Sequence, residues 1–89
     1  MYILATYDLD NPSSGAHKKV NEIFEKYGFY DNVCIGGEYL ELPTTTKLKY
    51  ADNINTLTLK IEKKKLLKAF EEEDINIGVL ILSSCSEIV

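Results

Sequence analysis

The stretch YILATYDL, residues 2–9, predicts the first strand of the protein. It is rich in β-branched and apolar residues and is long enough for a buried strand. The strand leads directly into two carboxylates, Asp8 and Asp10, and then into the turn DNPSSG at 10–15. Acidic residues in this place either end a strand or form a site, so the elements around them have to be located.

An amphipathic helix follows the turn. Four apolar residues recur at the spacing of one helix face, namely Val20, Ile23, Phe24 and Tyr27. We expect Ser13 or Ser14 to cap the first turn of this helix. Gly28 is expected to end it, because glycine readily adopts the left-handed backbone that follows many helices.

The middle of the chain consists of extended segments separated by turn residues. The pair Gly36–Gly37 interrupts FYDNVCIGGEYLEL at 29–42, which predicts a hairpin or a bulge. Pro43 ends this segment or places it at a sheet edge, since proline lacks the N–H that a sheet ladder needs. The segment TTTKLKY at 44–50 is expected to resume the strand.

The segment 56–72 fits two interpretations. A strand period comes first, in Leu57, Leu59 and Ile61, and a helix period follows, in Leu66 and Phe70. Either one helix covers the whole segment, or a strand at 56–61 precedes a helix at 62–72. The second interpretation matches the periodicity better and is the prediction adopted here.

The last strand is predicted within INIGVLILSS at 75–84, where residues 75–82 are almost continuously apolar and therefore expected to be buried. The order of elements is then β-α-β-β-α-β. Two helices can cover one face of a single antiparallel sheet in which the first and last strands are central. The predicted fold is therefore α+β, with the ferredoxin-like βαββαβ arrangement.

Length and composition indicate the class of protein. A chain of 89 residues, 45% of them hydrophobic and 27% charged, fits one folded domain over 1–89. A domain this small gains stability by sharing apolar surface, so a homodimer is expected. No apolar run reaches the roughly 18 residues of a membrane span, and the start lacks the basic region of a signal peptide. Together with two cysteines that make no disulfide framework, these features predict a cytoplasmic protein without a membrane partner.

The positive charge of the chain is concentrated in one segment. The net charge is −4, which argues against a dedicated binder of duplex DNA. All ten basic side chains are lysines, and half of them lie between residues 60 and 68. Lys63 and Lys64 in this cluster are candidates for contacts with phosphate, and a solvated helix face is the alternative.

Asp8 and Asp10 are the candidate catalytic residues. They are two residues apart and project to the same side if the chain stays extended. Two carboxylates on one side can ligate Mg²⁺, and in a two-fold dimer Asp8 of each chain could share one ion. Such an ion can activate water against a phosphodiester. The alternative is that both carboxylates accept hydrogen bonds from turn amides.

The turn before the first helix is a second candidate site. Ser13 and Ser14 precede a helix N-terminus, where backbone amides favour an anion such as phosphate, although capping alone also explains the two serines. His17 is the only histidine and lies on the first turn of this helix, where we expect it at the surface. It could act as a general base near Asp8 only if the turn folds back.

The opening MYILATYDL, followed by a turn, an amphipathic helix and KYGF at 26–29, resembles the start of a known family. The family is that of the small CRISPR-associated ferredoxin-fold nucleases that partner the spacer integrase. The opening is also similar to that of the VapD toxins, which share the superfamily. The resemblance covers about residues 1–30. It implies a homodimer with two sheets face to face, and a metal-dependent nuclease whose key acid is Asp8, preceded by Tyr7.

Two functions from different classes follow. The first is metal-dependent hydrolysis of a phosphodiester in RNA or single-stranded nucleic acid, with Mg²⁺ on Asp8 and with Asp10 assisting. The second is a non-catalytic dimeric binding or regulatory module that keeps the fold without the reaction. The strand-end aspartate favours the first function, whereas the acidic charge and the absence of arginine favour the second.

Overall fold

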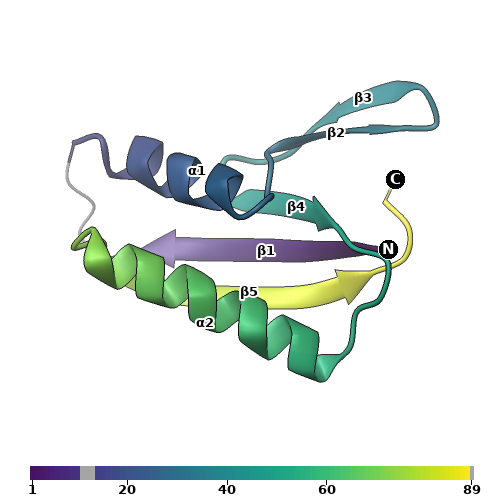
Figure 1. Ribbon diagram of the computed structural model, residues 1–89. Helices are drawn as coiled ribbons and strands as arrows, with labels where there is room; N and C mark the ends of the chain where they lie inside the picture. Colours follow the sequence, from purple (N-terminus) through teal and green to yellow (C-terminus); the bar gives the residue numbers. More distant parts are fainter. Residues whose placement is uncertain (11–13, 89) are drawn as a thin grey trace.

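The computed structural model describes residues 1–10 and 14–88 of the chain. The elements, in chain order, are β1 (Tyr2–Leu9), α1 (Ala16–Lys26), β2 (Asn32–Ile35), β3 (Glu38–Glu41), β4 (Thr46–Tyr50), α2 (Thr56–Glu72) and β5 (Ile77–Cys85). Strands β4, β1 and β5 form one antiparallel sheet in that order, and β2 pairs with β3 in a separate hairpin. Both helices lie on the same side of the three-stranded sheet (Figure 1). The predicted α+β class is confirmed.

The core lies between the sheet and the two helices. Alternate residues of β1 point toward the helices, and Ile3 and Tyr7 among them are buried. Phe24 of α1 and Phe70 of α2 pack edge to face, with ring centroids 5.5 Å apart. Phe24 also packs against the rings of Tyr7 and Phe29, at 5.4 and 5.7 Å. This aromatic cluster joins both helices to the central strand.

Helix α2 is continuous, so the predicted strand at 56–61 is wrong. Asn55 caps the helix, because its side-chain oxygen accepts a hydrogen bond from the Thr58 backbone N–H at 2.8 Å. Leu57 and Ile61 are exposed, whereas apolar residues of the second half of the helix reach the core. The strand was predicted because Leu57, Leu59 and Ile61 alternate with polar residues. Leu57 and Ile61 are in fact surface residues of the helix.

The predicted single sheet is divided in two. Gly36 and Gly37, at φ angles of 57° and 81°, lie between β2 and β3, where the hairpin turns. The hairpin departs from the main sheet, and a single bridge between Tyr30 and Leu48 connects this part of the chain to β4. The last strand is not central as predicted, because β5 pairs with β1 alone among the described residues and therefore forms a sheet edge.

The side of β1 and β5 that points away from the helices is named the outer face. It carries Thr6, Asp8, Val79, Ile81 and Ser83. Val79 and Ile81 are 50% and 54% exposed, so β5 is not buried on both sides as its apolar sequence predicted. Half-exposed branched side chains on a sheet face are typical of a surface that another layer covers.

Neither helix matches a membrane span. α2 is the longer of the two, with 17 residues, and five of them are lysines. None of the helices within 1–10 and 14–88 is both long and apolar enough to cross a bilayer.

Candidate functional site at the end of strand β1

Asp8 is exposed on the outer face, one residue before the end of β1. Its register partner on β5 is Val79. The side-chain hydrogen bonds and ion pairs of the described residues include none from Asp8. Toward the described part of the chain, its carboxylate is therefore available for a ligand.

A bulge separates Asp10 from Asp8. The register of β1 on β5 shifts between Asp8 and Leu9, and Gly78 is the residue of β5 that this shift leaves unpaired. A Cβ atom on Gly78 would lie 2.8 Å from Oδ1 of Asp10, so glycine leaves the room that the Asp10 carboxylate occupies. The prediction that Asp8 and Asp10 project to the same side assumed a regular extended strand. The bulge interrupts the strand between the two residues, so that assumption is wrong.

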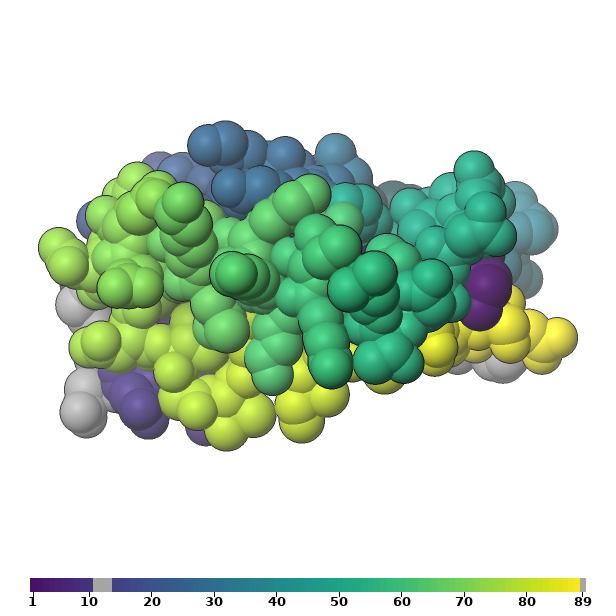
Figure 2. Space-filling view, turned by 60° about the horizontal axis from the view of Figure 1, so that its bottom comes forward, coloured from purple at the N-terminus to yellow at the C-terminus, as the bar shows by residue number. Residues whose placement is uncertain are grey.

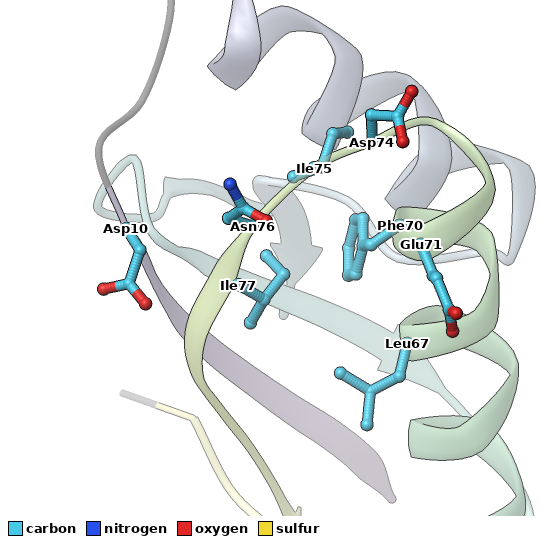
Figure 3. A pocket seen from close by; sticks show the side chains of 8 residues that line it. All are labelled: Asp10, Leu67, Phe70, Glu71, Asp74, Ile75, Asn76 and Ile77. Atoms are coloured by element: carbon cyan, nitrogen blue, oxygen red, sulfur yellow. The ribbon is translucent and has the colours of Figure 1, made fainter.

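Asp10 borders a pocket of about 630 Å³ between β5 and the end of α2 (Figure 3). Two further carboxylates, Glu71 and Asp74, line the same pocket, and Phe70 and Ile77 are among its apolar lining. In Figure 3, Asp10 and Glu71 stand at opposite sides of this pocket. Within the described ranges, no group of three or more His, Cys, Asp or Glu side chains is placed to hold a metal ion. The described part of one chain therefore provides exposed carboxylates, Asp8 and Asp10 among them, but not a complete metal site.

The turn before α1 does not form the predicted cap. Gly15 is the N-cap residue, at a φ of 83°, and none of the described side chains makes a capping hydrogen bond. Ser14 lies in the turn that precedes it, and Ser13 lies outside the described residues. Within the part of the chain that the structure describes, the first amides of α1 have no side-chain acceptor.

Lys63 and Lys64 lie on a different layer from Asp8. Both are exposed on α2, which crosses the front of the molecule in Figure 2. A shallow groove on the solvent-exposed surface of this helix is lined by Lys63 and Lys64 together with Lys60 and Lys68. Because α2 covers the opposite side of the sheet from the outer face, one chain does not place these lysines beside Asp8.

A polar cluster that the sequence did not predict lies on the helix side of β1. Tyr7 Oη is 3.3 Å from His17 Nδ1 and 3.5 Å from the carbonyl oxygen of Thr44. Lys47 Nζ donates to the same carbonyl oxygen at 3.0 Å. Since successive strand residues point to opposite sides, this cluster and Asp8 are separated by the sheet. His17 is therefore not placed as a general base for Asp8.

Burial shifts the pKa values of Lys47 and Tyr7 in this cluster. It lowers the pKa of Lys47, although the negative charges of Asp31 and Glu25 act in the opposite direction. Burial also raises the pKa of Tyr7. Both shifts disfavour the charged form, as expected for groups removed from water. The burial of Lys47 was not predictable from the sequence. Lys47 alternates with Leu48, and alternation predicts that one of the two is exposed, whereas the structure buries both.

The only indication of a known family is the resemblance of residues 1–30 described above. Comparison of the chain with models of protein families, with curated proteins and with solved structures found no match. The resemblance of residues 1–30 to the CRISPR-associated nucleases and the VapD toxins therefore stays a prediction, and the function has to be argued from the geometry.

Proposed function

We propose that this protein is a homodimeric, metal-dependent phosphodiesterase that acts on RNA or single-stranded nucleic acid. The observation that carries the proposal is the position of Asp8, an exposed carboxylate at the end of the central strand, on a solvent-accessible sheet face that also exposes Val79 and Ile81. A carboxylate in this position can bind a hard divalent cation such as Mg²⁺ without a rearrangement of the backbone.

The outer face is suited to a second copy of the chain. Val79 and Ile81 are half exposed and pair in register with Asp8 and Thr6. Two copies related by a two-fold axis on this face would bury these apolar side chains and bring the two Asp8 carboxylates together. Like charges at close range repel, and a Mg²⁺ ion between them would remove the repulsion. The dimer would thereby complete the ligand set that one chain lacks.

The chemistry follows from this arrangement. Asp8 would hold the Mg²⁺ ion, at the end of a strand that pairs with β4 on one side and β5 on the other. The ion would supply the activation of water and the polarisation of the phosphodiester. Asp10, across the bulge, is assigned an assisting role as a hydrogen-bond acceptor for water. Lys63 and Lys64, on the other layer, are assigned to flanking phosphates and not to the reacting one.

We also infer that the fold is a variant of the ferredoxin-like arrangement. The bridge between Tyr30 and Leu48 places the chain after α1 beside β4, which gives the spatial order Tyr30, β4, β1, β5. This order, with antiparallel neighbours throughout, is that of the split βαβ sheet. In this interpretation the second strand is reduced to one bridge, and its continuation forms the β2–β3 hairpin.

A non-catalytic dimeric binding or regulatory module is the second candidate. It is favoured by the lack of a three-residue metal group in the described part of the chain. The net charge of −4 without any arginine also favours it, because nucleic-acid binders gain much of their affinity from basic residues. Such a module would use the same outer face but would need no metal.

A nuclease assay with a matched control distinguishes the two candidates. Labelled RNA and single-stranded DNA are incubated with Mg²⁺ or Mn²⁺ and with the wild type, Asp8→Asn or Glu72→Gln. Glu72 is exposed on α2, so its substitution removes one negative charge far from the outer face. A folded state for each variant is checked by a melting scan.

The proposal predicts metal-dependent cleavage by the wild type and by Glu72→Gln. Asp8→Asn should be about a hundredfold less active, because the substitution removes a proposed metal ligand. Loss of a residue that only orients a metal ligand already reduces activity by up to about that factor. Equal cleavage by Asp8→Asn would contradict the role of Asp8. Absence of cleavage by folded wild type would favour the binding module.

A further inference from the structure

The buried lysine of β4 belongs to a cluster that the proposed phosphodiesterase does not use. An ammonium group carries three N–H donors, and Lys47 Nζ places one of them on the carbonyl oxygen of Thr44 at 3.0 Å. Its side chain is 2% exposed, and the ion pairs of the described residues do not include it. A buried charge without a paired counter-charge is costly. Among the described residues, Lys47 therefore has two N–H donors without a partner and no carboxylate within ion-pair distance.

The neighbouring lysine of the same strand shows the contrast. Lys49 lies two residues further along β4 and forms an ion pair with Glu62 of α2 at 3.0 Å. Asp31 and Glu25 act on Lys47 through space, but neither is within ion-pair distance of it. Of the two inward-facing lysines of β4, Lys49 therefore pairs with a carboxylate, whereas Lys47 donates only to a backbone carbonyl among the described residues.

Two more polar groups lie at the same carbonyl oxygen. Tyr7 Oη is 3.5 Å from the Thr44 oxygen and 3.3 Å from His17 Nδ1. One carbonyl oxygen is therefore shared by the ammonium of Lys47 and the hydroxyl of Tyr7. His17 and Thr44 are exposed, whereas Tyr7 and Lys47 are buried, so the cluster lies at the boundary between the surface and the core. Only one of the three N–H donors of Lys47 has an acceptor among the described residues, so a further acceptor with negative charge would suit this cluster.

We propose that Lys47, Tyr7 and His17 form a binding site for an oxyanion, and specifically for a phosphate group. A phosphate group presents several oxygen acceptors to an ammonium, a hydroxyl and an imidazole at once, and it brings the negative charge that Lys47 lacks. The phosphate comes either from the free ion or from the end of a nucleic-acid strand, and only the second source rests on the proposed function. The site lies on the helix side of the sheet, whereas Asp8 lies on the outer face.

A phosphate titration tests the site directly. Binding of inorganic phosphate is followed through the backbone amide spectrum at constant ionic strength, with chloride as the reference anion. The wild type is compared with Lys47→Met, which keeps the length of the side chain, and with Lys64→Met. Lys64 is exposed on α2, so its variant loses the same charge without touching the cluster.

The expected result is saturable binding by the wild type and by Lys64→Met, with shifts centred on residues 7, 17 and 44. In Lys47→Met the affinity should fall at least about tenfold, because a hydrogen bond to a charged group is lost. Tyr7→Phe removes only the hydroxyl and should weaken binding about threefold or more. The proposal would be overturned if the wild type showed no saturable binding, or if Lys47→Met and Tyr7→Phe both bound phosphate with wild-type affinity.

A second set of titrations identifies the source of the phosphate. A dinucleotide with a 5′-phosphate is compared with the same dinucleotide ending in a 5′-hydroxyl. Binding of the phosphorylated form tighter than that of inorganic phosphate assigns the site to a strand end, and weaker binding assigns it to the free ion. Asp8→Asn should bind phosphate as the wild type does, so failure of the phosphodiesterase proposal and failure of this one are distinguishable.

Discussion

Lys47 links the stability of the protein to pH. Burial holds its pKa below the ordinary value of 10.5 in the folded state, so the unfolded chain binds this proton more tightly. The unfolded state therefore carries more protons between the lowered pKa and 10.5, and stability should rise with pH across that interval. In Lys47→Met this contribution is lost, and the free energy of unfolding should depend less on pH.

Urea unfolding from about pH 7 to about pH 9.5 measures the effect. Across this window Tyr7, whose pKa burial raises, is still mostly protonated in the unfolded chain, so its opposing effect on stability is small. Lys64→Met, an exposed control, should keep the wild-type slope. Parallel pH profiles for the wild type and Lys47→Met would show that burial does not perturb this lysine.

At the scale of the elements, the start of α2 depends on Asn55. Its side-chain oxygen accepts hydrogen bonds from the backbone N–H of Thr58 at 2.8 Å and from the Thr58 hydroxyl at 3.1 Å. Asn55→Ala should cost about 1 kcal/mol, and the melting temperature should fall by about 4–8 °C for a domain of this size. Asn55→Asp keeps an acceptor and should melt close to the wild type. An unchanged melting temperature for Asn55→Ala in a circular dichroism scan would refute the cap.

The elements that sequence reasoning predicted well are those with long, regular patterns. The strand at 2–9 and the helix with Phe24 on its apolar face are present, because a buried face imposes its period on the sequence. The first half of α2 was missed because Leu57 and Ile61 are apolar but exposed, so they imitated the buried face of a strand. The cap at Asn55 was the signal that could have corrected this.

Pairing between strands was beyond the reach of local patterns. The apolar run of β5 suggested a central strand, yet Val79 and Ile81 are half exposed at a sheet edge. The candidate site was predictable only in part, for a similar reason. Asp8 could be identified from its place at a strand end, whereas the bulge that separates it from Asp10 and the burial of Lys47 depend on register, which one strand alone does not determine.

At the scale of the whole molecule, the outer face should hold a dimer together. Ile81→Lys places a charge in the centre of that face, and because Ile81 is 54% exposed in one chain, the fold should tolerate the change. We expect the dimer dissociation constant to rise at least about tenfold, since two buried apolar contacts become charged. Leu57→Lys is the matched control, because Leu57 is 65% exposed on α2, which covers the other side of the sheet. Sedimentation equilibrium gives both constants, and equal weakening by the two variants would argue against this interface.

A metal shared by two Asp8 carboxylates is tested by the effect of Mg²⁺ on dimerisation of the wild type and of Asp8→Asn. Sedimentation equilibrium is carried out in EDTA and in Mg²⁺ at equal ionic strength. If two Asp8 carboxylates share one ion across the outer faces, Mg²⁺ should tighten the wild-type dimer at least about tenfold, by removing the repulsion between like charges. The Asp8→Asn dimer should form equally well in both buffers. The same dissociation constant for the wild type with and without Mg²⁺, or no dimer in either buffer, would contradict a shared metal at Asp8.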